Sequence, residues 1–164
     1  MKCIQCNENE PNKESGLCDA CEKAEASKIN GLLYLPAAGL IFSLIFLPVE
    51  FFDLISAISA YFSRSGIITW YAAGAVVLLV ALIGITAYAS WHFFQRKRHT
   101  PRAMVIYYLA GVVSALWFAV LPVSLFGASW DNSSIRSVLS AFIGVTCWLP
   151  YFLKSRRIAQ VFVR

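Results

Sequence analysis

Four long apolar stretches dominate the chain and are separated by short polar segments. They run over Ile29–Val49, Ile67–Phe94, Ala103–Phe126 and Val138–Leu153, and none contains an internal Asp, Glu, Lys or Arg. Each approaches the roughly 20 helical residues needed to cross a hydrocarbon layer about 30 Å thick. The pattern therefore predicts an all-α membrane protein with four transmembrane helices.

A shorter amphipathic pattern follows the first apolar stretch. Because proline cannot continue the hydrogen bonding of a helix, Pro48 is expected to end the first span just before Glu50. Beyond it, apolar residues recur at helical spacing, at Phe51, Leu54, Ile55, Ile58, Tyr61 and Phe62. This spacing predicts a separate interfacial helix near residues 51–62 that lies on the membrane surface.

Glu50 and Asp53 are three residues apart and would share one face of that interfacial helix. Such a pair could bind a cation or a polar substrate. Two carboxylates at a solvated helix end are more often simply hydrated, so the sequence favours no site there. It leaves open whether Glu50 and Asp53 form a functional site.

Charged residues are few and unevenly distributed. Apolar residues make up 59% of the chain and charged residues 14%, against roughly 25% charged in an average soluble domain. The chain has 14 Lys and Arg and 9 Asp and Glu, and ten of these 23 lie in the first 28 positions. This segregation predicts a small soluble module over residues 1–28 and a transmembrane domain over residues 29–164.

The basic residues also predict the orientation of the spans. Twelve of the 14 Lys and Arg lie in segments that four spans would leave on one side of a membrane, and the exceptions are Arg64 and Arg136. Cytoplasmic segments of membrane proteins carry the excess of basic residues, so both termini and the loop Gln95–Arg102 are predicted to be cytosolic. Contact between this basic loop and membrane lipids is the expected consequence.

The chain ends in a basic cytosolic tail with its own apolar spacing. Ile158, Val161 and Phe162 follow one another at i, i+3 and i+4. This spacing predicts a short amphipathic segment that continues along the inner membrane surface.

Four cysteines form the one strong local motif. Cys3 and Cys6 make one C-x2-C pair, Cys18 and Cys21 make a second, and eleven residues separate the pairs. Two residues between thiols let a tight turn point both sulfurs at one metal ion, and the connecting segment is long enough to fold back. Four thiolates leave no open position for water, which is typical of a structural zinc site. The motif predicts a zinc-ribbon-like module.

Other interpretations of this module are less favoured. Redox or disulfide chemistry is the first alternative, but disulfides rarely persist in the cytosol, where the topology places these thiols. Nucleic-acid binding is the second. Residues 1–28 hold four Lys against six acidic residues, a formal charge of −2, whereas a phosphate-binding surface needs the opposite sign.

Small residues recur at four-residue intervals on the last two spans. Gly111, Ala115 and Ala119 do so on the third span, and Ser140 and Gly144 on the fourth. Small side chains let membrane helices approach closely. The pattern predicts contact between these two helices within one chain and leaves a homo-oligomer as the alternative.

Both ends of the membrane domain resemble a known family. The opening motif is GLLYLPAAGL over Gly31–Leu40, and the closing motif is WLPYFLKSRRI over Trp148–Ile158. They resemble the ends of a bacterial four-span family called domain of unknown function 2569, although Leu32 stands where a Trp is expected. The likeness covers about residues 29–163. It implies an inner-membrane protein without an assigned activity, with the cysteine module as an N-terminal extension.

Three classes of function remain open. A non-enzymatic interaction or scaffold protein is favoured, with residues 1–28 docking a cytosolic protein partner, because that module is too small for a substrate pocket. A small transporter or accessory subunit for neutral or lipid cargo is the alternative, disfavoured because the expected spans hold no ionisable side chain. A membrane enzyme ranks last, since the sequence shows no nucleophile–base pair, intramembrane acid pair or phosphate-binding glycine loop.

Overall fold

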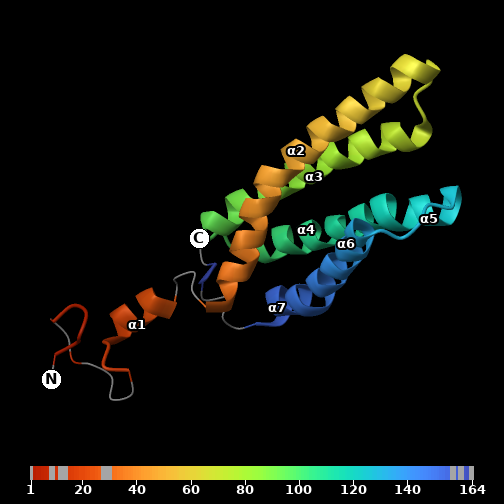
Figure 1. The fold of residues 1–164 in the computed structure, drawn as a ribbon. Coiled ribbons are helices and arrows are strands. Elements are labelled where there is room, and N and C mark those ends of the chain that lie inside the picture. The colour runs from red at the N-terminus through yellow and green to blue at the C-terminus, as the bar shows by residue number, and fades with distance from the viewer. Residues whose placement is uncertain are drawn as a thin grey trace.

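A computed structural model describes residues 2–7, 10, 15–26, 31–155, 158 and 161–162, and every regular element in these ranges is helical. Four helical segments are long and apolar enough to cross a membrane, which confirms the predicted all-α membrane fold (Figure 1). In chain order the elements are α1 (Asp19–Ala26), a 3-10 turn (Gly31–Leu33), α2 (Tyr34–Ser65), α3 (Trp70–Phe94), α4 (Thr100–Ala115), a π-helical turn (Leu116–Val120), α5 (Leu121–Phe126), α6 (Asn132–Ile143), a second π-helical turn (Gly144–Trp148) and α7 (Leu149–Lys154).

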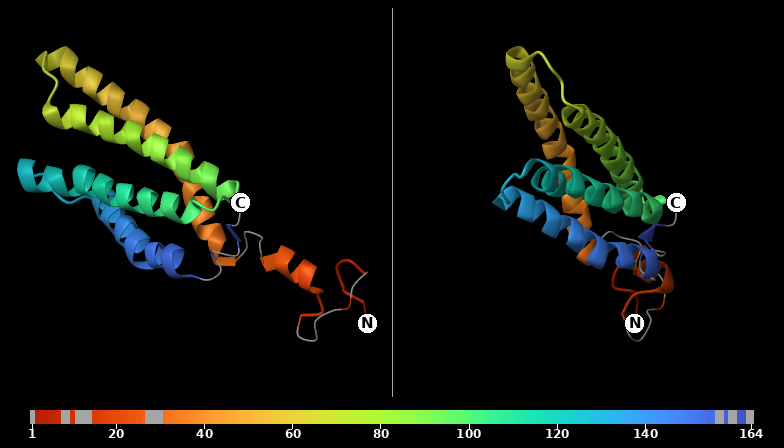
Figure 2. Two further views of the ribbon diagram at one scale, coloured as in Figure 1. Left: turned by 180° about the vertical axis from the view of Figure 1, so that it is seen from behind. Right: turned by 90° about the vertical axis from the view of Figure 1, so that its right-hand side faces the viewer.

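The four spans form two helical hairpins. Helix α2 packs along α3, and α4 packs along α6 and α7, while α3 also contacts α4 and so joins the hairpins. The hairpins lie together at one end of the bundle and diverge toward the other in every view (Figures 1 and 2). We call the joined end, which carries the loop 95–99, the basic end, and the opposite end, which carries the turns 66–69 and 127–131, the far end.

An apolar core closes the basic end. Its buried residues are Leu33, Ala37, Leu40, Ala89, Phe93, Ala103, Met104, Phe152, Ile158, Val161 and Phe162. The Phe93 and Phe162 ring centroids are 5.3 Å apart. Three tail residues therefore pack into the bundle, and the prediction of an amphipathic tail on the membrane surface is wrong for them. Burial in this core shields these side chains more completely than a membrane surface would.

Helix α2 continues through Pro48 without interruption. It has 32 residues, so it is about 48 Å long at 1.5 Å per residue, well beyond the hydrocarbon thickness. The predicted break at Pro48 is wrong, and residues 51–62 are the second half of α2 rather than a separate helix. The ribbon bends partway along α2 (Figure 1), the usual response to a proline that removes one hydrogen bond. Glu50 thus lies in the middle of a helix.

Short polar side chains and glycines set the ends of the helices at the far end. Thr69 Oγ1 accepts a hydrogen bond from the Ala72 N–H at 3.3 Å at the start of α3. Asp131 Oδ1 accepts one from the Ser134 N–H at 2.9 Å at the start of α6. Each bond satisfies an amide that the helix leaves unpaired. Gly66 ends α2 at φ 68° and Gly127 ends α5 at φ 65°, left-handed conformations that favour glycine.

A π-helical turn precedes a Leu-Pro pair in both of the last two spans. The N–H of Leu121 bonds to the carbonyl of Leu116, and the N–H of Leu149 bonds to that of Gly144, each five residues back. A proline ring one position later would clash with the carbonyl four residues before it in a regular α-helix. The wider π turn relieves that clash and keeps each span continuous.

Trp117 joins the two hairpins beyond the core. Its indole stacks on the Tyr71 ring with centroids 5.7 Å apart and an interplanar angle of 5°. Its backbone carbonyl accepts a 3.4 Å hydrogen bond from the Tyr71 hydroxyl. A Cβ added to Gly74 would fall on the indole ring, so only a glycine there allows this approach.

We expect Gly74→Ala to lower the stability of the bundle by about 1–3 kcal/mol, because the added methyl overpacks the Trp117 contact. Thermal unfolding in detergent, followed by tryptophan fluorescence, measures the change. Gly84→Ala is the matched control, since a Cβ at Gly84 meets no atom within 4 Å. Equal midpoints for the two variants would show that the glycine at position 74 is not required.

The orientation of the spans stays a prediction and is tested by thiol labelling. In a Cys147→Ser background, a membrane-impermeant maleimide added to intact spheroplasts should label Ser133→Cys and spare Lys97→Cys, because the basic residues hold loop 95–99 inside. Labelling of Lys97→Cys from outside would contradict the predicted threading.

Candidate metal centre

Four cysteine sulfurs converge at the start of the chain. The Sγ atoms of Cys3, Cys6, Cys18 and Cys21 all lie within 4.8 Å of one another. The Cys3 and Cys18 side chains are buried, and those of Cys6 and Cys21 are partly buried. The structure thus brings together all four residues of the predicted site.

Two left-handed residues shape the first half of this cluster. Asn7 follows the first pair at φ 54°, and its N–H donates to the carbonyl of Cys3 at 3.0 Å. Gly16 takes φ 68°, and its carbonyl accepts the Ile4 N–H at 3.3 Å. These bonds close a tight turn around Cys3 and Cys6 and hold Gly16 beside it. Asparagine and glycine tolerate that conformation better than other residues do.

Helix α1 positions the second pair. Cys18 immediately precedes α1, and its carbonyl accepts the Glu22 N–H at 2.9 Å, which begins the helix. The Cys18 N–H donates to Cys3 Sγ at 3.2 Å, a bond that joins the two halves of the module. Cys21 follows in the first turn of α1, where it faces the same centre.

Backbone donors favour the thiolate form at one position of the cluster. The N–H of Cys6, followed by those of Cys18 and Gln5, lowers the pKa of Cys3 to about 6. The hydrogen bond with Cys18, followed by burial, raises the pKa of Cys21 to about 12. Four thiolates this close together repel one another, and a bound cation compensates that repulsion.

The geometry of the donor set fits a four-coordinate metal ion. Tetrahedral coordination at a metal–sulfur distance of about 2.3 Å places sulfurs about 3.8 Å apart. The Sγ atoms of Cys6 and Cys18 are 3.6 Å apart, too far for a disulfide and close to that spacing. All five cysteines of the chain are free thiols in the structure. The module can therefore hold one metal ion, with no coordination position left for a substrate.

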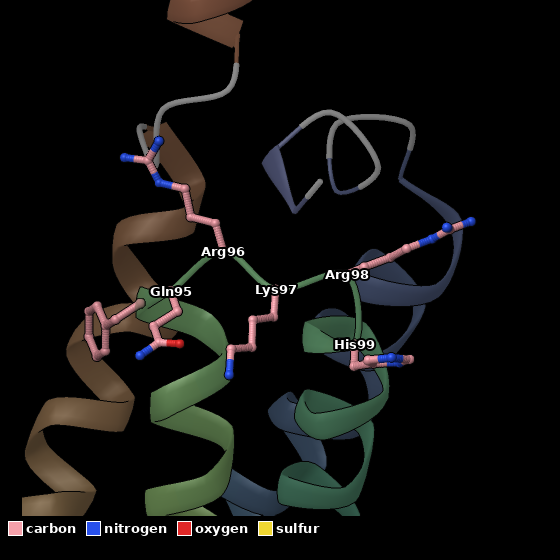
Figure 3. Close-up of a pocket in the computed structure, with 6 residues that line it drawn as sticks. Gln95, Arg96, Lys97, Arg98 and His99 are labelled. Atoms are coloured by element: carbon pink, nitrogen blue, oxygen red, sulfur yellow. The ribbon is translucent and has the colours of Figure 1, made fainter. Parts of the chain in front are cut away.

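The basic loop does not form a second compact site. Residues Phe94–His99 line an open recess of about 880 Å³. Arg96, Lys97 and Arg98 point in three different directions from the loop (Figure 3). The Lys97 Nζ lies 5.4 Å from the centre of the Trp91 ring. Divergent cations of this kind suit contact with several lipid headgroups better than the enclosure of one anion.

The two carboxylates that the sequence paired, Glu50 and Asp53, both lie on the continuous helix α2. Glu50 lines a cavity of about 320 Å³ between the spans, together with polar residues of the other helices. Asp53 does not line that cavity. The sequence does not mark this cavity as one motif because each span contributes only one to three of its polar side chains. The available signal was helical spacing, such as Ser43 and Glu50 at i and i+7.

These observations define a four-span helical membrane protein with a tetracysteine centre before its first span. The model of the family described as "Protein of unknown function (DUF2569)" matches residues 26–163, so the chain belongs to that family and the predicted resemblance is confirmed. The cysteine centre precedes the matched segment.

The chain is also similar to the inner membrane protein YdgK of Escherichia coli (strain K12). The two are 32% identical over 88 residues, which cover 48% of this chain and 56% of the relative. The match therefore spans little more than half of that relative's length. No solved structure matches the chain. The family, this relative and the four apolar helices support a multi-pass inner-membrane protein.

We expect the cluster to bind one Co²⁺ per chain with the absorption bands of tetrahedral thiolate coordination, because all four sulfurs already face one centre. Cys18→Ser should abolish these bands. Cys147→Ser is the matched control and should leave them unchanged, since Cys147 lies outside the cluster. Full retention of the bands in Cys18→Ser would contradict this ligand set.

Proposed function

We propose that this chain is a non-enzymatic scaffold protein of the inner membrane whose cysteine module docks a cytosolic protein partner. The membrane domain anchors the module, and the module presents the contact surface. Zinc is the proposed resident ion because a closed set of four thiolates favours it over harder divalent ions. Its role would be to hold the module folded, since so small a segment buries little apolar surface of its own.

Ile4 carries the docking proposal. It lies between the paired cysteines Cys3 and Cys6, and its side chain is 79% exposed. A Cβ on Gly16 would lie 2.9 Å from Ile4 Cδ1, so the missing side chain makes room for the isoleucine. A large apolar side chain held outward on a rigid turn is suited to contact with a protein. The formal charge of −2 over residues 1–28 supports a protein partner over nucleic acid.

The proposal predicts that Ile4→Asp removes the partner without removing the metal. A photocrosslinking residue at Lys2 should capture a discrete product in cells, and Ile4→Asp and Cys18→Ser should each reduce it by about tenfold or more. Both variants remove the contact surface, the first by charge and the second by unfolding the module.

Ala20→Asp is the matched control because it adds the same charge at an exposed position of α1. It should retain the crosslinked product. Deletion of residues 1–28 should also remove the product while the chain remains in the membrane. Products of equal yield from Ile4→Asp and Ala20→Asp would reject docking through Ile4.

A small transporter, or an accessory subunit of one, is the second candidate. One observation favours it: Glu50 lies within α2 and lines a cavity between the spans, although the sequence had placed it after the first span. Ionisable residues within membrane segments commonly mark a solute or ion site. This function would survive deletion of residues 1–28, which separates it from docking.

A further inference from the structure

All four spans contribute polar side chains to one cavity. This inner cavity has a volume of about 320 Å³. Helix α2 contributes Ser43 and Glu50, α3 contributes Thr86, α4 contributes Tyr107 and Ser114, and α6 contributes Ser137. Side chains that face a helix bundle within a membrane are normally apolar or small. So many hydroxyl groups facing one space indicate a polar occupant.

Thr86 points to the same conclusion by its hydrogen bonding. Its side chain is 1% exposed, and its hydroxyl has no hydrogen-bond partner within the described residues. A buried hydroxyl without a partner costs free energy, so native structures rarely keep one that serves no purpose. Across the cavity, the Ser43 and Tyr107 hydroxyls do bond to each other, at 2.8 Å. Thr86 is therefore available to a ligand, and the Ser43–Tyr107 pair forms part of the wall.

The inner cavity is closed on one side and continues on the other. Tyr107 and Tyr108 line it and pack against the apolar core of the basic end. Toward the far end it shares Glu50, Ser114 and Ser137 with an outer cavity of about 710 Å³. A ligand would therefore enter from the far end, through the outer cavity between α2, α4 and α6, where the ribbons of α2 and α6 lie apart (Figure 2).

Two opposite charges face this path without neutralising each other. Glu50 lines both cavities, and Arg136 lines the outer one. Neither forms an ion pair with any residue that the structure describes. Glu50 contributes the acidic side chain in the wall of the inner cavity. The inner cavity therefore favours a cationic group, and the outer cavity offers an anionic group a partner.

We propose that these cavities bind a small zwitterion, with its ammonium group at Glu50 and its anionic group directed toward Arg136. Thr86 and the serine hydroxyls would accept hydrogen bonds from the ammonium group. A volume of about 320 Å³ lies at the lower end of the range for small-molecule sites. The ligand is either a free solute or the zwitterionic headgroup of a membrane lipid. This site does not depend on docking through the cysteine module.

Calorimetric titration of the delipidated full-length protein in detergent tests the proposal. The probe is phosphoethanolamine, which carries both charges, compared with ethanolamine and inorganic phosphate, which carry one each. Phosphoethanolamine should bind saturably, and each single-charge probe should bind at least about tenfold more weakly, the size expected for losing a charged hydrogen bond. The absence of saturable phosphoethanolamine binding would overturn the proposal.

Substitutions test whether Glu50 and Arg136 bind phosphoethanolamine. Glu50→Gln and Arg136→Gln should each weaken phosphoethanolamine binding at least about tenfold. Asp53→Asn and Arg64→Gln are the matched controls on α2 and should stay within about twofold of the wild type. Thr86→Val keeps the shape of the side chain and should weaken binding about fivefold even if a charge variant fails to fold. Unchanged affinity in correctly folded Glu50→Gln would reject the site.

Reconstitution of the protein into nanodiscs distinguishes a free solute from a lipid headgroup as the ligand. In nanodiscs of phosphatidylglycerol, whose headgroup carries no ammonium group, soluble phosphoethanolamine should bind as it does in detergent. In nanodiscs that contain phosphatidylethanolamine, loss of binding would identify the lipid headgroup as the occupant, because the lipid already fills the site. Equal binding in both membranes would identify a free solute. Failure of docking through Ile4 would leave each of these results unchanged.

Discussion

The apolar core at the basic end is the contact on which the rest of the bundle depends. Helices in hydrocarbon gain little from the hydrophobic effect when they associate, because lipid chains are as apolar as the side chains they replace. Close packing must supply the attraction. Here Phe93 of α3, Phe152 of α7 and Phe162 of the tail fill one centre between the hairpins. Toward the far end, Tyr71 of α3 still contacts Trp117 and Phe126 of the other hairpin. The polar cavities lie where α2, α4 and α6 face one another.

The sequence predicted the features that depend on residues close together in the chain. The four spans follow from the length of apolar stretches, and the cysteine centre follows from two C-x2-C pairs. Features that depend on distant neighbours were not predictable. Pro48 has the local character of a helix end, yet the long helix α2 bends instead of breaking. Val161 and Phe162 have the spacing of a surface helix, yet both are buried in the apolar core of the basic end.

The position of Glu50 explains why the cavity could not be predicted from the sequence. Its position in space depends on whether α2 ends at Pro48, and nothing within the first span decides that. Once α2 continues, the carboxylate faces Ser114 and Ser137, which belong to two other helices. An ion or solute site within a membrane normally needs an ionisable group in a span, and the apolar stretches alone hold no acidic or basic residue. Helix α2 supplies such a group in Glu50, so the cysteine centre and the bundle each offer a separate route to function.

The paired π-helical turns have a consequence for how the last two spans are compared with relatives. Each turn inserts one residue relative to a regular α-helix, which rotates the positions beyond it by about 100° around the helix axis. A single helical wheel drawn through the third or fourth span therefore assigns the wrong face to α5 or α7. The two halves of each span need separate wheels. A relative that lacked the Leu-Pro pair and one residue of the preceding turn would keep the same faces in contact.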